Sequence, residues 1–65
     1  MNFIQLTAKE TGIKVLINLK QVHDIRQIDG ETTIDFGNDE PVWVVSESVE
    51  DIAAALNASN SLINI

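Results

Sequence analysis

Residues 41–56 read PVWVVSESVEDIAAAL, and within this stretch the spacing of the apolar side chains changes from that of a strand to that of a helix. The first part, residues 41–46, alternates as a β-strand does, and Pro41 is expected to begin it because proline cannot donate a ladder hydrogen bond. Both faces of this strand are apolar, so it is central in a sheet or covered on its second face. Val42 and Val44 share one face, and Trp43 and Val45 share the other.

The second part of the stretch predicts an amphipathic helix over residues 48–57. Its apolar side chains recur at i, i+3, i+4 and i+7, the spacing that places them on one face of a helix. Ser48 precedes them, and Asp51 follows three residues later in the pattern of a capping box. One helix of this length cannot cover both faces of the strand before it, so the sequence predicts a second covering surface.

The first part of the chain alternates as strands and hairpins do. Residues 2–8 and 13–19 predict an antiparallel hairpin that turns near Gly12. Asp29-Gly30 is typical of a type I′ turn and joins predicted strands at 23–29 and 31–36. Alternation places Ile13, Val15, Ile17 and Leu19 on one face of their strand and Lys14, Leu16 and Asn18 on the other. In the strand over residues 31–36, Thr32, Ile34 and Phe36 are expected to face inward and Thr33 and Asp35 outward.

The segment between the two hairpins is ambiguous. Val22, Ile25 and Ile28 recur every third residue, which matches neither a strand nor a regular helical stripe. We expect a turn or 3₁₀ segment over residues 18–22 and then a strand. A short helix over residues 20–28 is the alternative.

These elements predict one small α+β domain over residues 1–65. We expect an antiparallel sheet, or an SH3-like partly open barrel, of four to five strands over residues 1–46, followed by one C-terminal helix. Residues 58–65 form a tail rich in apolar, β-prone side chains. The tail is expected either to pair as an extra strand with a sheet edge or to pack on the core of its own chain.

The composition excludes several classes of protein. Hydrophobic residues make up 45% of the 65 residues and charged residues 22%, which is typical of a globular domain and argues against disorder. The absence of cysteine excludes disulfides, thiolate metal sites and cysteine nucleophiles. No 18-residue apolar run or signal-peptide pattern is present, so a cytoplasmic location without membrane association is expected. So short a chain buries little apolar surface, which favours a homo-oligomer.

Charge is distributed unevenly along the chain. The formal net charge is −6, and all four basic residues precede residue 27, whereas eight acidic residues follow it. This balance argues against nucleic-acid and anionic-membrane binding, which need concentrated positive charge. The acidic stretch is interpreted either as a solubilising surface or as a docking face for a protein partner with a basic surface. The candidate docking residues are Asp29, Glu31, Asp35, Asp39 and Glu40.

No residue pattern predicts catalysis, a cofactor or a metal site. His23 is the only histidine, and without a nucleophile or further ligands near it in the sequence it is interpreted as structural or solvated. Trp43 is interpreted either as a core residue or as an interface anchor, a role in which tryptophan is enriched. The candidate interface residues are Val42, Trp43, Val45, Leu62, Ile63 and Ile65.

Three stretches resemble the FlbD family of small flagellar and swarming-motility proteins. Residues 3–7 and 15–19, FIQLT and VLINL, are similar to the first hairpin of that family, and Val22, Ile25 and Ile28 are similar to the segment that follows it. Thr33-Ile34 and residues 44–52, VVSESVEDI, resemble its closing step from strand to helix. The resemblance covers residues 3–56 and implies a regulatory or accessory role without enzymatic activity. Residues 38–41, NDEP, depart from it, since basic residues usually stand there.

The sequence therefore predicts a non-enzymatic bacterial protein-interaction or regulatory module that self-associates. One alternative is an acidic nucleic-acid mimic from a mobile element that binds a basic host protein. A second alternative is a weak nucleic-acid binder, which would need the basic residues of the first part on one face. These residues are Lys9, Lys14, Lys20 and Arg26.

Overall fold

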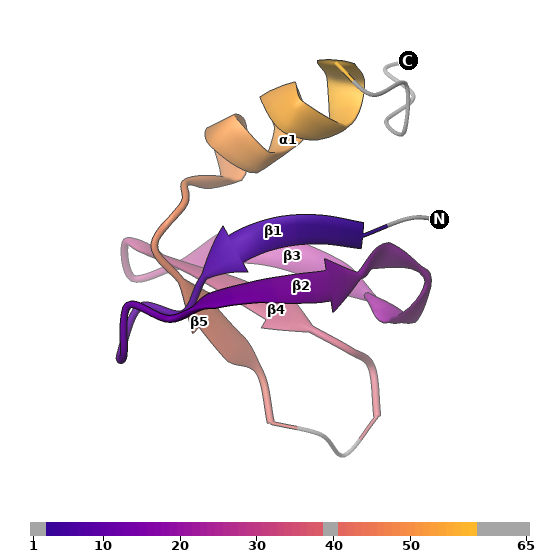
Figure 1. The fold of residues 1–65 in the computed structure, drawn as a ribbon. Coiled ribbons are helices and arrows are strands. Elements are labelled where there is room, and N and C mark those ends of the chain that lie inside the picture. The colour runs from indigo at the N-terminus through magenta and orange to yellow at the C-terminus, as the bar shows by residue number, and fades with distance from the viewer. Residues whose placement is uncertain (1–2, 39–40, 59–65) are drawn as a thin grey trace.

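The computed structural model describes residues 3–38 and 41–58, which fold into five β-strands, one 3₁₀ helix and one α-helix (Figure 1). The prediction of a small α+β fold with antiparallel strands and a C-terminal helix is confirmed. The elements, in chain order, are β1 (Phe3–Thr7), β2 (Lys14–Asn18), η1 (Leu19–Gln21), β3 (Asp24–Ile28), β4 (Glu31–Asp35), β5 (Trp43–Val45) and α1 (Val49–Ala58).

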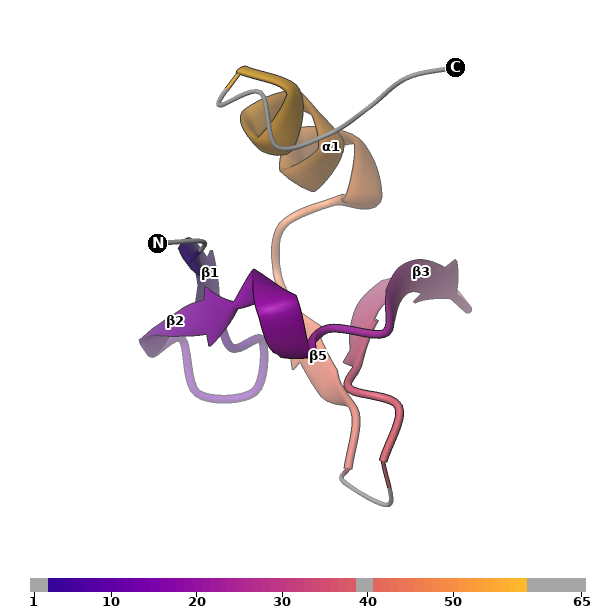
Figure 2. The ribbon, with the colours of Figure 1, turned by 90° about the vertical axis from the view of Figure 1, so that its right-hand side faces the viewer.

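The strands form two small antiparallel sheets, one of β1 and β2 and one in the order β3-β4-β5. A seam between β1 and β5 joins the two sheets, because Ala8 forms an isolated antiparallel bridge with Val45. On either side of it, the Ser46 N–H donates to the Thr7 carbonyl at 2.9 Å and the Lys9 N–H donates to the Val44 carbonyl at 3.0 Å. Across the molecule the strands therefore follow the order β2-β1-β5-β4-β3, with β2 and β3 at the two ends (Figure 2).

Local sequence signals account for the connections. Asp29 and Gly30 both have positive φ, 52° and 79°, as the type I′ turn between β3 and β4 requires. Asn18 caps the 3₁₀ helix, since its side-chain oxygen accepts the Lys20 N–H at 3.1 Å. Strand β3 follows directly, so the alternative of a short helix over residues 20–28 is wrong.

Helix α1 begins as its sequence predicts and contributes to the core. The Ser48 hydroxyl accepts the Asp51 N–H at 3.0 Å, which satisfies one of the unpaired donors at the start of the helix. The helix lies beside the strands and contacts β3 (Figure 1). Its Ile52 completes the core, whose buried apolar residues are Leu6, Ile17, Ile34, Val45 and Ile52.

The start of the last strand differs from the prediction, and two side chains have an exposure that alternation alone does not give. Pro41 does not begin a strand, because β5 contains only Trp43–Val45. Ile13 is 61% exposed, since it lies in the connection before β2. Thr33 shares the outer face of the sheet with its paired residue Val44, as expected, yet it is only 8% exposed. It lies on the central strand β4 between its paired neighbours Arg26 and Val44, and its hydroxyl donates to the Arg26 carbonyl at 3.1 Å.

The pairing of β4 with β5 decides which way Trp43 faces. Trp43 lies directly opposite Ile34 in the ladder, and paired residues share a face of an antiparallel sheet. Trp43 and Val45 are therefore on the core side, while Val44 is on the outer side. The predicted tail strand falls on residues 59–65, which lie outside the described residues, and Ala58 ends α1. Neither helix of the described residues has the length and hydropathy needed to cross a membrane.

Candidate interaction site

More large apolar side chains are exposed than buried in the described part of the chain. Six are exposed, against five in the buried core. Five of these six, together with Phe36, line hollows that meet at the Trp43 side chain. We call these five residues and Phe36 together the Trp43 surface. Its members are Phe3, Ile13, Leu16, Phe36, Val42 and Trp43. An exposed apolar group of this kind is typical of a protein-protein contact site.

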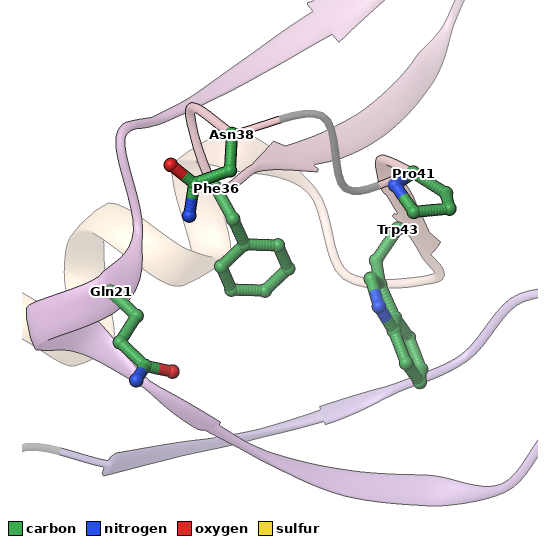
Figure 3. Close-up of a pocket in the computed structure, with 5 residues that line it drawn as sticks. All are labelled: Gln21, Phe36, Asn38, Pro41 and Trp43. Carbon is green, nitrogen blue, oxygen red and sulfur yellow. The ribbon is translucent and has the colours of Figure 1, made fainter.

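Trp43 separates three hollows. One, of about 590 Å³, is an open hollow lined by β2 from Val15 to Asn18 and also by Phe36 and Trp43. A second, of about 570 Å³, lies on the Val42 side of the indole, and a third, of about 470 Å³, lies between Trp43 and Gln21. Figure 3 shows the Phe36 ring between Gln21 and Trp43, with the Trp43 indole extending toward the hairpin strands. An incoming segment on any of these sides therefore meets the same indole.

The backbone of β2 is open along this surface. The Ala8 N–H donates to the Ile13 carbonyl at 2.8 Å, so these two residues form a hydrogen-bonded pair. Hydrogen-bonded pairs alternate in an antiparallel ladder, so Val15 and Ile17 direct their backbone groups toward β1. The backbone groups of Lys14, Leu16 and Asn18 point away from β1. In the described residues 3–38 and 41–58, no strand pairs with that edge of β2. The Leu16 side chain, on the outer face of the same strand, is 67% exposed.

The predicted interface residues are only partly available for contact. Val42 and Trp43 are 52% and 41% exposed, as an interface role requires. Val45 is 2% exposed, because it faces the core beside Ile34, and so it is not part of the site. Leu62, Ile63 and Ile65 lie outside the described residues. Sequence reasoning overlooked Leu16, although the alternation of residues 13–19 already placed it among the polar side chains of the outer face.

The candidate acidic docking face is not continuous in the described residues. Asp29 and Glu31 lie at one end of β4, and Asp35 lies at the other, about 13 Å away along the strand. Glu31 forms an ion pair with Lys9 at 3.0 Å, and an Asp35 carboxylate oxygen accepts the Gly37 N–H at 2.7 Å. Asp39 and Glu40 fall outside the described residues. The acidic side chains that the structure describes thus mostly serve local contacts.

The basic residues are likewise engaged or dispersed. Arg26 binds Asp24 with two hydrogen bonds, Nε to Oδ1 at 3.1 Å and Nη2 to Oδ2 at 2.7 Å. These bonds lower the pKa of the Asp24 carboxyl and raise the pKa of the Arg26 guanidinium. Lys9 is paired with Glu31, while Lys14 lies on β2 and Lys20 on η1. This placement does not gather the four cations into one patch.

His23 packs against a turn. Its Nδ1 lies 3.2 Å from an Asp24 carboxylate oxygen, and 66% of its side chain is exposed. Gly37 has a φ of 79°, and a Cβ there would lie 2.9 Å from the His23 Cβ. The imidazole therefore covers a turn that only glycine fits. Within the described ranges, no three histidine or carboxylate side chains come together in a group that could hold a metal ion.

Glu47 is a structural residue that sequence reasoning did not identify. Its carboxylate accepts two hydrogen bonds from Thr7, from the backbone N–H and from the hydroxyl, each at 2.9 Å. Burial by itself raises the pKa of this carboxyl, but the hydrogen bonds from Thr7 and from its own N–H outweigh burial and hold the pKa below its ordinary value. Glu47 thus extends the seam between the two sheets beyond Ser46.

The chain matches no protein-family description, no curated protein and no solved structure. The resemblance to the FlbD family therefore stays a prediction.

Proposed function

We propose that this chain is a non-enzymatic bacterial interaction module, regulatory or accessory in role, that self-associates through the Trp43 surface. The observation that carries the proposal is the convergence of three hollows on one partly exposed tryptophan. A tryptophan in this setting is the kind of residue that dominates binding energy at protein interfaces. The resemblance to small motility proteins supports the same class of function.

The size of the molecule supports self-association. Its accessible surface is 4875 Å², and a standard interface takes about 800 Å² from each partner. Such a contact would use about one sixth of the surface (800 of 4875 Å²). A monomer of this size is near the lower limit of independent stability, so burial of the Trp43 surface between copies would also stabilise the fold.

The acidic mimic and the weak nucleic-acid binder receive less support from the contacts. Glu31 and Asp24 already hold Lys9 and Arg26. In each ion pair a negative and a positive charge offset each other, which leaves less net charge for binding a basic protein or a nucleic acid.

The test compares solution masses by light scattering after size exclusion. We expect the full chain to be a dimer and Trp43→Ala to dimerise at least about 30-fold more weakly, the loss typical of an interface hot spot. Ile28→Ala is the matched control, because Ile28 is 48% exposed but does not belong to the Trp43 surface. Circular dichroism checks that each variant is folded. A full chain that is monomeric at high concentration would contradict the proposal.

A chain ending at Ala58 tests whether the last residues contribute. We expect it to remain a dimer, since the Trp43 surface lies wholly within residues 3–58. If this shortened chain is monomeric while the full chain is a dimer, the interface belongs to Leu62, Ile63 and Ile65 instead.

A further inference from the structure

We propose that two copies of this chain join by antiparallel pairing of their β2 edges, with Leu16 of each copy on the two-fold axis. This inference rests on the proposed self-association and specifies its geometry. The two β2 hairpins would then form one continuous four-stranded sheet in the order β1-β2-β2-β1 across the dimer.

The backbone of β2 fits this register. Because Leu16 directs its N–H and C=O away from β1, it would form a hydrogen-bonded pair with the partner's Leu16. In the same register Lys14 lies opposite the partner's Asn18, whose backbone groups also point to the open edge. The Leu16 pair would form two hydrogen bonds and each outer pair would form one, from the Asn18 N–H to the Lys14 carbonyl, because the Asn18 carbonyl caps η1 and accepts the first hydrogen bond of that helix. Centring the two-fold axis on Val15 would instead pair Lys14 with the partner's Leu16, and centring it on Ile17 would pair Leu16 with the partner's Asn18. These registers also use outward-pointing backbone groups, but only the register centred on Leu16 places the two exposed Leu16 side chains opposite each other.

The side chains fit the register as well. Leu16 would bury its exposed apolar surface against the partner's Leu16. Lys14 would meet an amide rather than a second lysine. The two Lys14 residues would be offset by four positions, about 13 Å along the strand, which exceeds the screening length of about 8 Å at physiological ionic strength. The pairing therefore brings no like charges into contact.

The hollow beside β2 connects the edge to the Trp43 surface. It follows β2 from Val15 to Asn18 and is walled by Phe36 and Trp43. A strand added to the β2 edge would lie beside this hollow, so it would cover apolar side chains as well as satisfy backbone groups. Exposed strand edges are templates for a further strand, and the β2 edge contains no proline and only one charged side chain, Lys14. A second copy pairing through the same edge gives a closed two-fold dimer.

Single cysteines test the register directly, because the chain has none of its own. Paired residues of this kind lie about 5.5 Å apart between Cα atoms, within the range that a disulfide spans. We expect Leu16→Cys to form a disulfide-linked dimer under mild oxidation and Lys14→Cys, its matched control, to stay largely unlinked. A mixture of Lys14→Cys and Asn18→Cys chains should link into heterodimers. Equal linking of the Leu16 and Lys14 variants would overturn the proposed register.

Proline substitution tests whether backbone pairing holds the dimer together. Leu16→Pro removes an N–H that faces the open edge and none that bonds β1, a position at which strands accept proline. Leu16→Ala removes the side chain but keeps the N–H. We expect the proline variant to be monomeric at concentrations where the alanine variant still dimerises, with circular dichroism confirming the fold of both.

These outcomes distinguish self-association, which is the proposed function, from pairing of the β2 edges, which is its proposed geometry. If the full chain is monomeric, both the proposed function and this inference fail. If it is a dimer that neither links through Leu16→Cys nor dissociates in Leu16→Pro, self-association stands and edge pairing is wrong.

Discussion

The two outer strands of the molecule differ in how their edges are protected. Strand β3 carries Asp24 and Arg26, joined by two hydrogen bonds, and the C-terminal helix contacts it. Strand β2 carries a single charge, Lys14, and presents Leu16 to solvent. Charged side chains and covering helices are the usual means of keeping a sheet edge from pairing with another chain. Among the described residues, the comparison thus distinguishes a charged strand that α1 contacts, β3, from an apolar outer strand, β2.

The largest effect is expected from a second charge on β2, beside that of Lys14. We expect Leu16→Lys to weaken dimerisation at least about 100-fold, because the two-fold axis places the new charges side by side and removes the apolar contact. The monomer should keep its stability within about 0.5 kcal/mol, since the side chain is exposed in the free chain. Light scattering and urea unfolding measure the two effects. Lys14→Gln is the matched control at the same edge and should stay a dimer.

Much of the fold follows from local sequence signals. Asp29-Gly30 predicts its turn because two successive positive φ angles are needed there. Ser48 and the apolar spacing after it predict where α1 begins because capping acts within one turn.

What the sequence does not predict depends on strands that are distant in the chain. The burial of Thr33 depends on β4 having neighbours on both sides. The side on which Trp43 and Val45 lie depends on pairing with Ile34. Glu47 and Thr7 are 40 residues apart, so no local sequence pattern predicts their contact. The openness of β2 depends likewise on which strands pair with it, although the outward position of Leu16 was visible in the alternation.

A smaller effect is expected at the seam between the two sheets, where Glu47 binds Thr7. We expect Glu47→Gln to lower the free energy of unfolding by about 1 kcal/mol, because one Thr7 donor would face an amide NH₂ instead of an oxygen. The edges themselves are unchanged, so the dimer should persist. Chemical denaturation at neutral pH measures the loss. Glu50→Gln, an exposed control in the first turn of α1, should change stability less.

The same carboxylate predicts a dependence on pH. Its pKa is lower in the folded chain than its ordinary value of 4.5, so its contribution is fully present above that value and is lost as the pH falls through the lower folded pKa. The stability difference between the wild type and Glu47→Gln should therefore shrink on acidification below about 4.5. Unfolding curves between neutral and acidic pH test this. A constant difference would show that the variant acts through packing rather than charge.

The smallest effect is expected at the protected edge. Arg26→Met removes the guanidinium from β3 and leaves Asp24 without its main partner, so the pKa of Asp24 should rise toward its ordinary value. Because both groups are exposed, stability should change little. If charge is what keeps the β3 edge from pairing, the double variant Asp24→Asn and Arg26→Met, which removes both charges, should form species larger than the dimer at high protein concentration, as light scattering would detect. If this double variant stays a dimer and becomes monomeric when Leu16→Lys is added, the contact with α1 rather than charge protects β3.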